Sequence, residues 1–268
     1  MLVKVKGLVL RSEDVGERDR LFRVLTAEGK IYVLAKGAIS SDGKPRICLL
    51  PMLYAELVLY KKGDRYWLRE YEVLEDFRKL YRELERLLLG QYIMSLADRV
   101  AVMEQDRSAL LSLALNSLYL LAETEKPCAH IKAVTELRVA LDEGYAPRLE
   151  ACIRCDKPPQ DGKAALDVMG GGIVCSDCLN SGPTLMLPPE ADEIREASLL
   201  LPLSSTVLAA LRYVFTAPAK KAFSFTLPDE EAERLAEVAE LYLLSHIGED
   251  FPELKIYKDT VKEAYKQK

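Results

Sequence analysis

Residues 53–73 read LYAELVLYKKGDRYWLREYEV, and this stretch decides the first part of the fold. Two runs rich in apolar and aromatic residues flank the tripeptide Lys62-Gly63-Asp64. Such runs, bounded by a short turn sequence that contains glycine, are typical of two antiparallel β-strands. We therefore predict a β-hairpin that turns at Gly63.

Three further strands precede the hairpin. The stretch VKVKGLVLR at 3–11 mostly alternates, and RLFRVLT at 20–26 and KIYVLAKG at 30–37 are rich in β-branched and aromatic residues. A short connection joins the second and third strands, whereas the polar connection at 36–51 is long and contains Gly and Pro. Five strands with one long loop are typical of a small closed barrel. We predict an OB-fold, and an SH3-like barrel would produce nearly the same pattern.

From Phe77 onward the pattern becomes helical, because apolar residues recur every three or four positions. The first such series comprises Leu80, Leu84, Leu87, Leu88, Tyr92 and Leu96. Further helices are predicted at 107–123, 127–143, 189–199, 203–215 and 229–246. The fold class is therefore α+β, with an N-terminal five-stranded OB-fold barrel followed by an all-helical domain that carries an inserted zinc segment.

The zinc segment is predicted from CIRCDKPPQDGKAALDVMGGGIVCSDC at 152–178, which holds two Cys-x-x-Cys pairs separated by 19 residues. Four thiolates satisfy the tetrahedral preference of Zn²⁺, so the site is closed and structural, with one Zn²⁺ per chain. Four unrelated buried cysteines and a redox dithiol are the alternatives, but a dithiol needs only one pair and a βαβ context. The predicted ligands are Cys152, Cys155, Cys175 and Cys178. Cys48 and Cys128 stand alone and are expected to fill core.

These patterns predict four parts of the chain. They are an OB-fold nucleic-acid-binding domain at 1–76, a helical domain at 77–148 and 182–250, a zinc-binding insertion at 149–181 and a C-terminal tail at 251–268. The longest uncharged stretches, 108–122 and 197–211, have 15 residues each and are too short for a bilayer, so we interpret both as buried helices. Because Lys4 and Lys6 interrupt the first apolar run, no secretion signal is recognised and a cytoplasmic protein without membrane contact is expected.

The charge distribution favours the barrel as the phosphate-binding part. The whole chain carries −5, but residues 1–80 carry +4 and the remainder −9. Barrels of this type bind single strands by tracking phosphates with cations and stacking bases on aromatic rings. The loop at 36–46 is the strongest site, although solvated strand faces and loop charges would explain the same residues. The predicted nucleic-acid-binding residues are Arg11, Arg18, Arg20, Lys30, Tyr32, Lys36, Lys44 and Arg46.

Catalytic signatures are not found in the sequence. The phosphate loop G-x-x-x-x-G-K-[ST], the dinucleotide motif G-x-G-x-x-G and the nucleophile motif G-x-S-x-G do not occur. His130 and His246 sit in helical patterns with no recognisable catalytic partner, so each is interpreted as a packed or surface histidine. We predict that the chain is not an enzyme.

Three stretches together carry a family resemblance: GLVLRSEDVGERDRLFRVLTAEGKIYVLAKGA at 7–38, ELRVALDEGYAPRLEACIRC at 136–155, and AELYLLSHIG at 239–248. On these stretches the chain resembles the DNA repair and recombination protein RecO family over nearly its full length. The resemblance implies an OB-fold, a helical domain and a zinc segment. It also implies binding to single- and double-stranded DNA, annealing of complementary strands, and association with RecR and single-stranded DNA-binding protein to help load RecA.

The chain departs from the family where basic residues often follow 36–38, because Ile39, Ser40 and Ser41 stand there. If the chain binds phosphate only modestly, its recruitment to coated DNA would depend partly on the C-terminal tail of single-stranded DNA-binding protein. The resemblance implies that this tail is acidic with an apolar end. We predict Arg138 as the cation at the rim of its apolar groove; pairing with Glu136, Asp142 or another neighbour is the alternative. The sequence thus predicts a non-enzymatic recombination mediator, against an adaptor whose partners make the DNA contacts.

Overall fold

The structure is a computed structural model of the 268-residue chain, and it describes residues 1–40, 44, 46–47, 49–159, 163–181, 199–248 and 250–266. The chain divides into two compact units. The first comprises Met1–Cys128 together with Phe251–Lys268, and the second comprises Ala129–Asp250. The second unit is therefore an insertion in the first, since the chain leaves the first unit after Cys128 and returns to it at Phe251.

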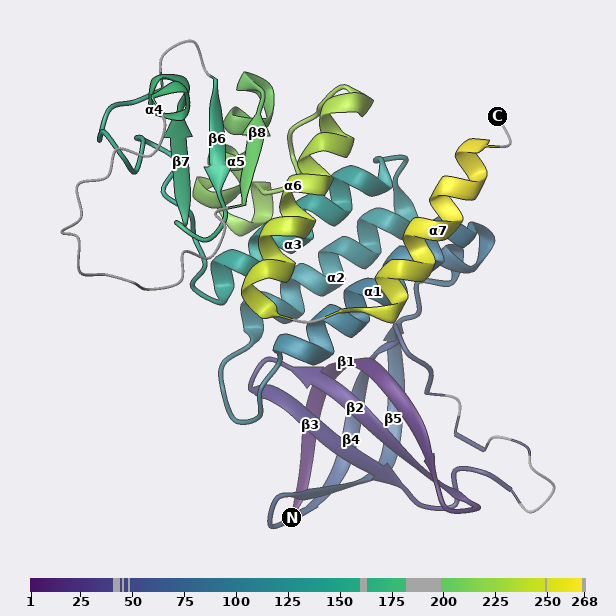
Figure 1. Cartoon of the computed structure of the whole chain (residues 1–268). Helices are drawn as coiled ribbons and strands as arrows, with labels where there is room; N and C mark the ends of the chain where they lie inside the picture. The colour runs from purple at the N-terminus through teal and green to yellow at the C-terminus, as the bar shows by residue number, and fades with distance from the viewer. Residues whose placement is uncertain are drawn as a thin grey trace. The chain divides into compact units, whose positions relative to one another are not determined.

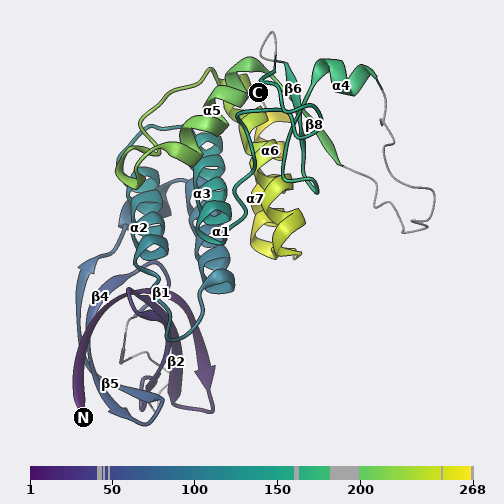
Figure 2. The same ribbon diagram turned by 90° about the vertical axis from the view of Figure 1, so that its left-hand side faces the viewer.

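The first unit begins with a closed five-stranded barrel (Figures 1 and 2). Its strands are β1 (Leu2–Val15), β2 (Asp19–Thr26), β3 (Gly29–Ala35), β4 (Tyr54–Lys62) and β5 (Arg65–Glu75). They follow the order β1-β2-β3-β5-β4, and β4 pairs back with β1. All pairs are antiparallel except β3 with β5. The predicted hairpin and the predicted OB-type barrel are thereby confirmed.

The barrel closes because β1 is long enough to pair on both sides. Its first half, Leu2–Leu8, pairs with β4, and its second half, Gly7–Val15, pairs with β2. Gly7 lies where the two pairings meet, and a Cβ atom there would lie 2.3 Å from Val24 Cγ1. Inward-facing apolar side chains fill the interior, among them Val9, Phe22, Val24, Val33, Ala55, Leu57 and Leu59.

Helices complete the first unit. They are α1 (Leu84–Val100), α2 (Ser108–Glu123) and α7 (Pro252–Lys266), with a short 3₁₀ helix, η1 (Arg78–Arg82), before α1. Figures 1 and 2 show α7 beside α1, where Tyr92 and Phe251 meet edge to face at 5.6 Å between ring centroids. The segment 251–268 was expected as a tail, and the structure differs there. Although the segment is rich in charged residues, it also carries an apolar stripe in which Phe251, Leu254 and Tyr257 are buried.

The second unit combines helices with a small sheet. Its elements are α3 (Cys128–Asp142, whose first residue belongs to the first unit), β6 (Ala164–Asp167), β7 (Gly172–Cys175), α4 (Ser176–Asn180), β8 (Leu200–Leu203), α5 (Ser205–Thr216), the 3₁₀ helix η3 (Ala219–Lys221) and α6 (Asp229–Ile247). The three strands form an antiparallel sheet in the order β7-β6-β8. Within the described parts of the chain, no helix is both long and apolar enough to cross a membrane.

The predicted helices at 107–123, 127–143, 203–215 and 229–246 are confirmed as α2, α3, α5 and α6. The prediction at 189–199 falls outside the described residues apart from Leu199. The uncharged stretch 197–211 was wrongly interpreted as one helix, since residues 200–203 form β8 before α5 starts. Pro202 disfavours a helix interior, whereas an edge strand tolerates it.

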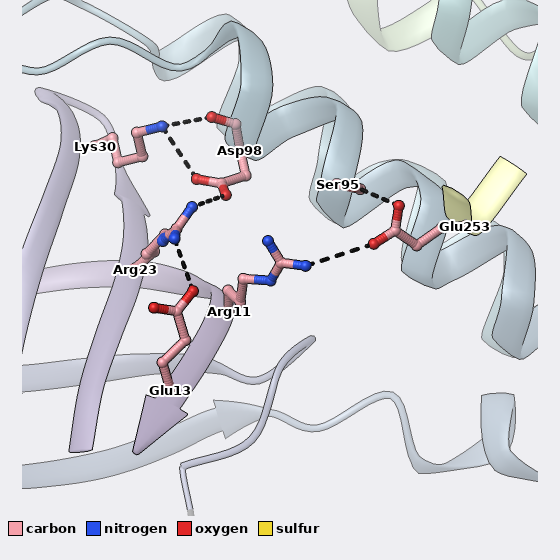
Figure 3. A network of polar contacts seen from close by, with 7 residues as sticks. All are labelled: Arg11, Glu13, Arg23, Lys30, Ser95, Asp98 and Glu253. Carbon is pink, nitrogen blue, oxygen red and sulfur yellow. Dashed lines mark hydrogen bonds and ion pairs between the residues drawn. The ribbon is translucent and has the colours of Figure 1, made fainter. Parts of the chain in front are cut away.

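A polar network attaches the barrel to α1 within the first unit (Figure 3). The carboxylate of Asp98 accepts hydrogen bonds from Arg23 Nη1 at 2.8 Å and from Lys30 Nζ at 3.1 Å. The side chains of Lys30 and Asp98 are each 13% exposed. Arg23 also donates to the exposed carboxylate of Glu13 at 2.7 Å. One helix carboxylate thus neutralises cations from two neighbouring strands.

We predict that Asp98→Asn lowers the free energy of unfolding of the first unit by about 2 kcal/mol, because two half-buried cations lose their charged acceptor. Urea unfolding followed by the fluorescence of Trp67, which lies in the barrel, measures this loss. Glu13→Gln is the matched control and should change stability by no more than about 0.5 kcal/mol, since its carboxylate is exposed. Equal losses in the two variants would contradict a special role for Asp98.

Candidate metal centre and nucleic-acid interface

The structure brings the four predicted metal ligands together. All four sulfur atoms of Cys152, Cys155, Cys175 and Cys178 lie within 4.8 Å of one another. The Sγ atoms of Cys155 and Cys175 are 3.7 Å apart. Tetrahedral Zn²⁺ with bonds of about 2.3 Å places its sulfur ligands roughly 3.8 Å apart. The donor set therefore fits a tetrahedral metal ion with four sulfur ligands.

A tight turn positions the first cysteine pair. The Cys152 N–H donates to the Lys157 carbonyl at 2.8 Å, and the Asp156 N–H donates to the Cys152 carbonyl at 2.9 Å. Asp156 adopts a left-handed backbone conformation with φ of 61°. Aspartate tolerates this region better than most residues because its short side chain can hydrogen-bond locally. Asp156 thus makes the turn that glycine often makes after such a pair.

The second pair is placed by β7 and α4. Cys175 ends β7, and Cys178 lies on α4. A Cβ atom on Gly172 would lie 2.4 Å from Ile153 Cγ2 and 3.0 Å from the Arg148 carbonyl oxygen. Glycine at this position therefore lets β7 approach the segment that carries the first pair.

The thiols respond differently to their surroundings. Burial opposes ionisation of Cys152, but backbone N–H groups of Cys175, Cys155 and Arg154 outweigh it and lower the pKa of this thiol to about 6. A hydrogen bond with Cys155, together with burial and the other thiols, raises the pKa of Cys178 to about 12. One sulfur is thus prepared as an anion while its neighbours resist a second negative charge. A bound cation would relieve that repulsion, which is the chemistry expected of a thiolate metal site.

The predicted DNA-binding residues fall into two groups. Arg18, Lys36, Lys44, Arg46 and Tyr32 are exposed. The main chain anchors the described part of the loop, since the Ser40 N–H donates to the Lys44 carbonyl at 2.8 Å and the Arg46 N–H to the Ala38 carbonyl at 2.7 Å.

The second group is already engaged in ion pairs of the first unit. Lys30 binds Asp98, as described, and Arg20 Nε donates to Asp14 at 2.7 Å with 22% of its side chain exposed. Arg11 lies 3.7 Å from Glu253 of α7 but is 52% exposed (Figure 3). Of the three, Arg11 retains the largest exposed surface, whereas Lys30 is directed toward α1.

Sequence reasoning missed a cationic and aromatic cluster on the outer face of β4 and β5. Tyr60 pairs directly opposite Trp67, with ring centroids 6.0 Å apart. Together with Lys36, the cluster lines a surface pocket of about 830 Å³. The available signal was the two-residue period in DRYWLRE, which places Arg65, Trp67 and Arg69 at alternating positions.

Arg138, the predicted partner-binding cation, is half-buried and structural in this conformation. Its Nη1 donates to the carbonyls of Val214 at 3.2 Å and Ala217 at 3.0 Å, at the C-terminal end of α5. Arginine often satisfies the last carbonyls of a helix in this way. Glu136, offered as its ion-pair partner, instead accepts from Lys132 at 2.8 Å.

The histidines and the described lone cysteine pack against their neighbours. His130 is 2% exposed and its ring lies 4.4 Å from that of Phe225. His246 Nδ1 hydrogen-bonds the Tyr242 carbonyl at 2.8 Å. Burial raises the pKa of the Cys128 thiol to about 12. Cys48 lies outside the described residues.

Comparisons with known proteins agree over both parts of the chain. The family model for the N terminal of recombination protein O matches residues 1–77, and that for its C terminal matches residues 81–255. The DNA repair protein RecO of Acetivibrio thermocellus is 29% identical over 261 residues, which cover 96% of each chain. Those of Anaeromyxobacter sp. (strain K) and Bacillus subtilis are 30% and 25% identical over 249 residues, covering 92% of this chain and 92% and 91% of theirs. The chain therefore belongs to the RecO family of DNA repair proteins.

Proposed function

We propose that the chain is a non-enzymatic recombination mediator that acts in the cytoplasm. It binds single- and double-stranded DNA, anneals complementary strands, and helps load RecA onto single-stranded DNA together with RecR and single-stranded DNA-binding protein. The observation that carries this proposal is the closed barrel with exposed cations in a member of the RecO family. DNA binding by the barrel is therefore the property to test first.

The phosphate contacts proposed for the barrel are centred on the loop after β3. Lys36, Lys44 and Arg46 are exposed there. The described residues that follow Lys36 to Ala38, Ile39 and Ser40, are uncharged. Cations in such a loop release counterions when they bind phosphate, so binding weakens as salt rises.

Replacing Lys36, Lys44 and Arg46 together with glutamine should weaken DNA binding regardless of sequence and flatten its salt dependence. Each lost phosphate contact reduces the slope of log affinity against log salt by about 0.7 for single strands and about 0.9 for duplex. A salt titration with a fluorescent oligonucleotide measures both effects. The matched control replaces three exposed helix cations, Lys220, Lys221 and Lys255, and changes the net charge equally.

If the slope of log affinity against log salt is unchanged in the loop variant, the DNA site lies outside the barrel loop. Absence of DNA binding by the wild-type chain at low salt would instead favour the second candidate function, a protein-interaction adaptor whose partners supply the DNA contacts. The acidic net charge of −5 is the observation that favours the adaptor.

For the metal site we propose one structural Zn²⁺ per chain, held by Cys152, Cys155, Cys175 and Cys178. Four sulfur ligands leave no open coordination position, so bound zinc supplies no reaction chemistry and only stabilises its surroundings. The close approach of the four sulfurs supports this proposal. The strands and the helix around them are only four or five residues long, and small segments of this kind commonly depend on metal to fold.

Metal analysis of the purified chain should find about one zinc per chain after mild dialysis. Cys152→Ser should lose the metal and destabilise the second unit, because a hydroxyl does not replace a thiolate ligand. Cys128→Ser is the control and should retain zinc, because Cys128 is buried but is not part of the sulfur cluster. A folded, metal-free chain with four freely titrating thiols at these positions would contradict the site.

The receptor for the tail of single-stranded DNA-binding protein stays a prediction at Arg138. Arg138→Ala should weaken binding of the tail peptide about fivefold or more, as expected when a hydrogen bond to a charged group is lost. Because Arg138 also caps α5, the control must lose comparable structural hydrogen bonds. Arg212→Ala does so, since Arg212 donates to the Leu149 carbonyl at 2.7 and 2.9 Å. Equal peptide affinity in both variants and the wild type would exclude Arg138 from the receptor.

A further inference from the structure

The outer face of the β4–β5 hairpin carries a pocket with an unusual combination of side chains. Four cations and two aromatic rings line it, and no carboxylate is among its described lining residues. Asp64 and Glu70 lie nearby in sequence but do not line the pocket. The lining cations and rings are Lys36, Lys62, Arg65, Arg69, Tyr60 and Trp67.

Strand register assembles this pocket. Tyr60 lies opposite Trp67 and Lys62 opposite Arg65, and alternate residues of a strand share one face. Because β3 runs parallel to β5, Leu34 pairs beside Trp67, and Lys36 follows two residues later in the same direction. A shift of register between Val58 and Leu59 separates the hairpin end from the rest of the ladder.

The rings are held at the surface without belonging to the barrel core. Tyr66 and Leu68, the neighbours of Trp67, pack against the core cluster, whereas Trp67 and Tyr60 do not. Arg69 places its guanidinium carbon 5.5 Å from the centre of the Tyr60 ring. The two rings are tilted by 45°, so neither covers the face of the other. The tryptophan is therefore not required to fill the interior.

We propose that this pocket binds single-stranded nucleic acid by stacking an unpaired base on Trp67, with Tyr60 beside it and the four cations on the flanking phosphates. The inference rests on the proposed function and deepens it, because it names the strand state that the barrel prefers. A duplex keeps its bases stacked inside, so only an unpaired base offers its face to a surface ring. Cations alone would attract both forms through phosphate.

Charge complementarity together with the two aromatic rings favours nucleic acid as the occupant. A polyanion neutralises Lys36, Lys62, Arg65 and Arg69 together, whereas an apolar protein segment would leave four cations without counter-charge. Stacking on a tryptophan is tolerant of base identity, because every base has a π-face. The pocket should therefore favour single strands over duplex without reading sequence.

Trp67 is the single tryptophan of the chain, so its fluorescence reports on this pocket directly. The full-length chain is titrated with a short oligo(dT) strand and with a duplex of equal length. Oligo(dT) should quench Trp67, and saturating duplex should quench it markedly less. Binding of both is measured in parallel by anisotropy of a label on the DNA.

Trp67→Leu should reduce oligo(dT) affinity by about fivefold to a hundredfold, the range for removal of one stacked base, while duplex affinity changes less than about twofold. Trp67→Phe keeps a ring and should recover most of the loss. Tyr119→Leu, which removes an aromatic side chain 55% exposed on α2, is the matched control and should leave both affinities unchanged. Circular dichroism checks that each variant is folded.

Three outcomes would overturn the pocket while leaving the proposed function intact. They are wild-type binding to oligo(dT) without quenching, a Trp67→Leu variant of unchanged affinity, and equal losses for single strand and duplex. If Trp67→Leu does not fold, the pocket is tested instead by the oligo(dT) affinity of Tyr60→Leu and by quenching of Trp67 in the wild type. A wild-type chain that binds neither form of DNA at low salt would overturn the proposed function itself.

Discussion

Closure of the barrel by β1 is the constraint on which the rest of the first unit depends. One strand pairs with β4 through its first half and with β2 through its second, and the absence of a Cβ atom at Gly7 permits the close packing where these pairings meet. Closure removes free sheet edges and directs the apolar side chains inward. The outer faces of β3, β4 and β5 are then available for cations and aromatic rings, which are the residues a nucleic-acid surface needs.

The same unit shows why cation counts alone do not locate a binding surface. Arg23 and Lys30 come from the barrel, yet both are directed to Asp98 on α1. The structure separates them from the exposed Lys36, which lines the pocket that also contains Arg69. An ion pair between distant segments depends on tertiary packing, and neither charge nor spacing in the sequence shows which cations will be neutralised.

The burial pattern of each element explains how much of the fold could be predicted from the sequence. The barrel strands and helices α2, α3, α5 and α6 were predicted from apolar residues that recur every two or every three to four positions. This pattern arises because each element buries one of its faces. Four cysteines at ligand spacing predict their own cluster, because two Cys-x-x-Cys pairs separated by about 20 residues are typical of a tetrahedral metal site. Strand β8 was missed because length and lack of charge do not distinguish a strand from a helix. Trp67 was missed because the residues beside it on the barrel surface are brought there by pairing between strands, and the sequence of one strand does not show that pairing.

The metal centre and the barrel contribute in different ways. In the proposed zinc site, four sulfurs would saturate a tetrahedral ion, so the metal would stabilise the second unit locally and offer no reactive position. The function proposed for the chain accordingly rests on its surfaces. A surface built from a few exposed cations and one or two stacked bases binds moderately and releases readily as salt rises. Such a balance would suit the proposed role in annealing strands and loading RecA, because DNA that is bound too tightly is not released for the next step.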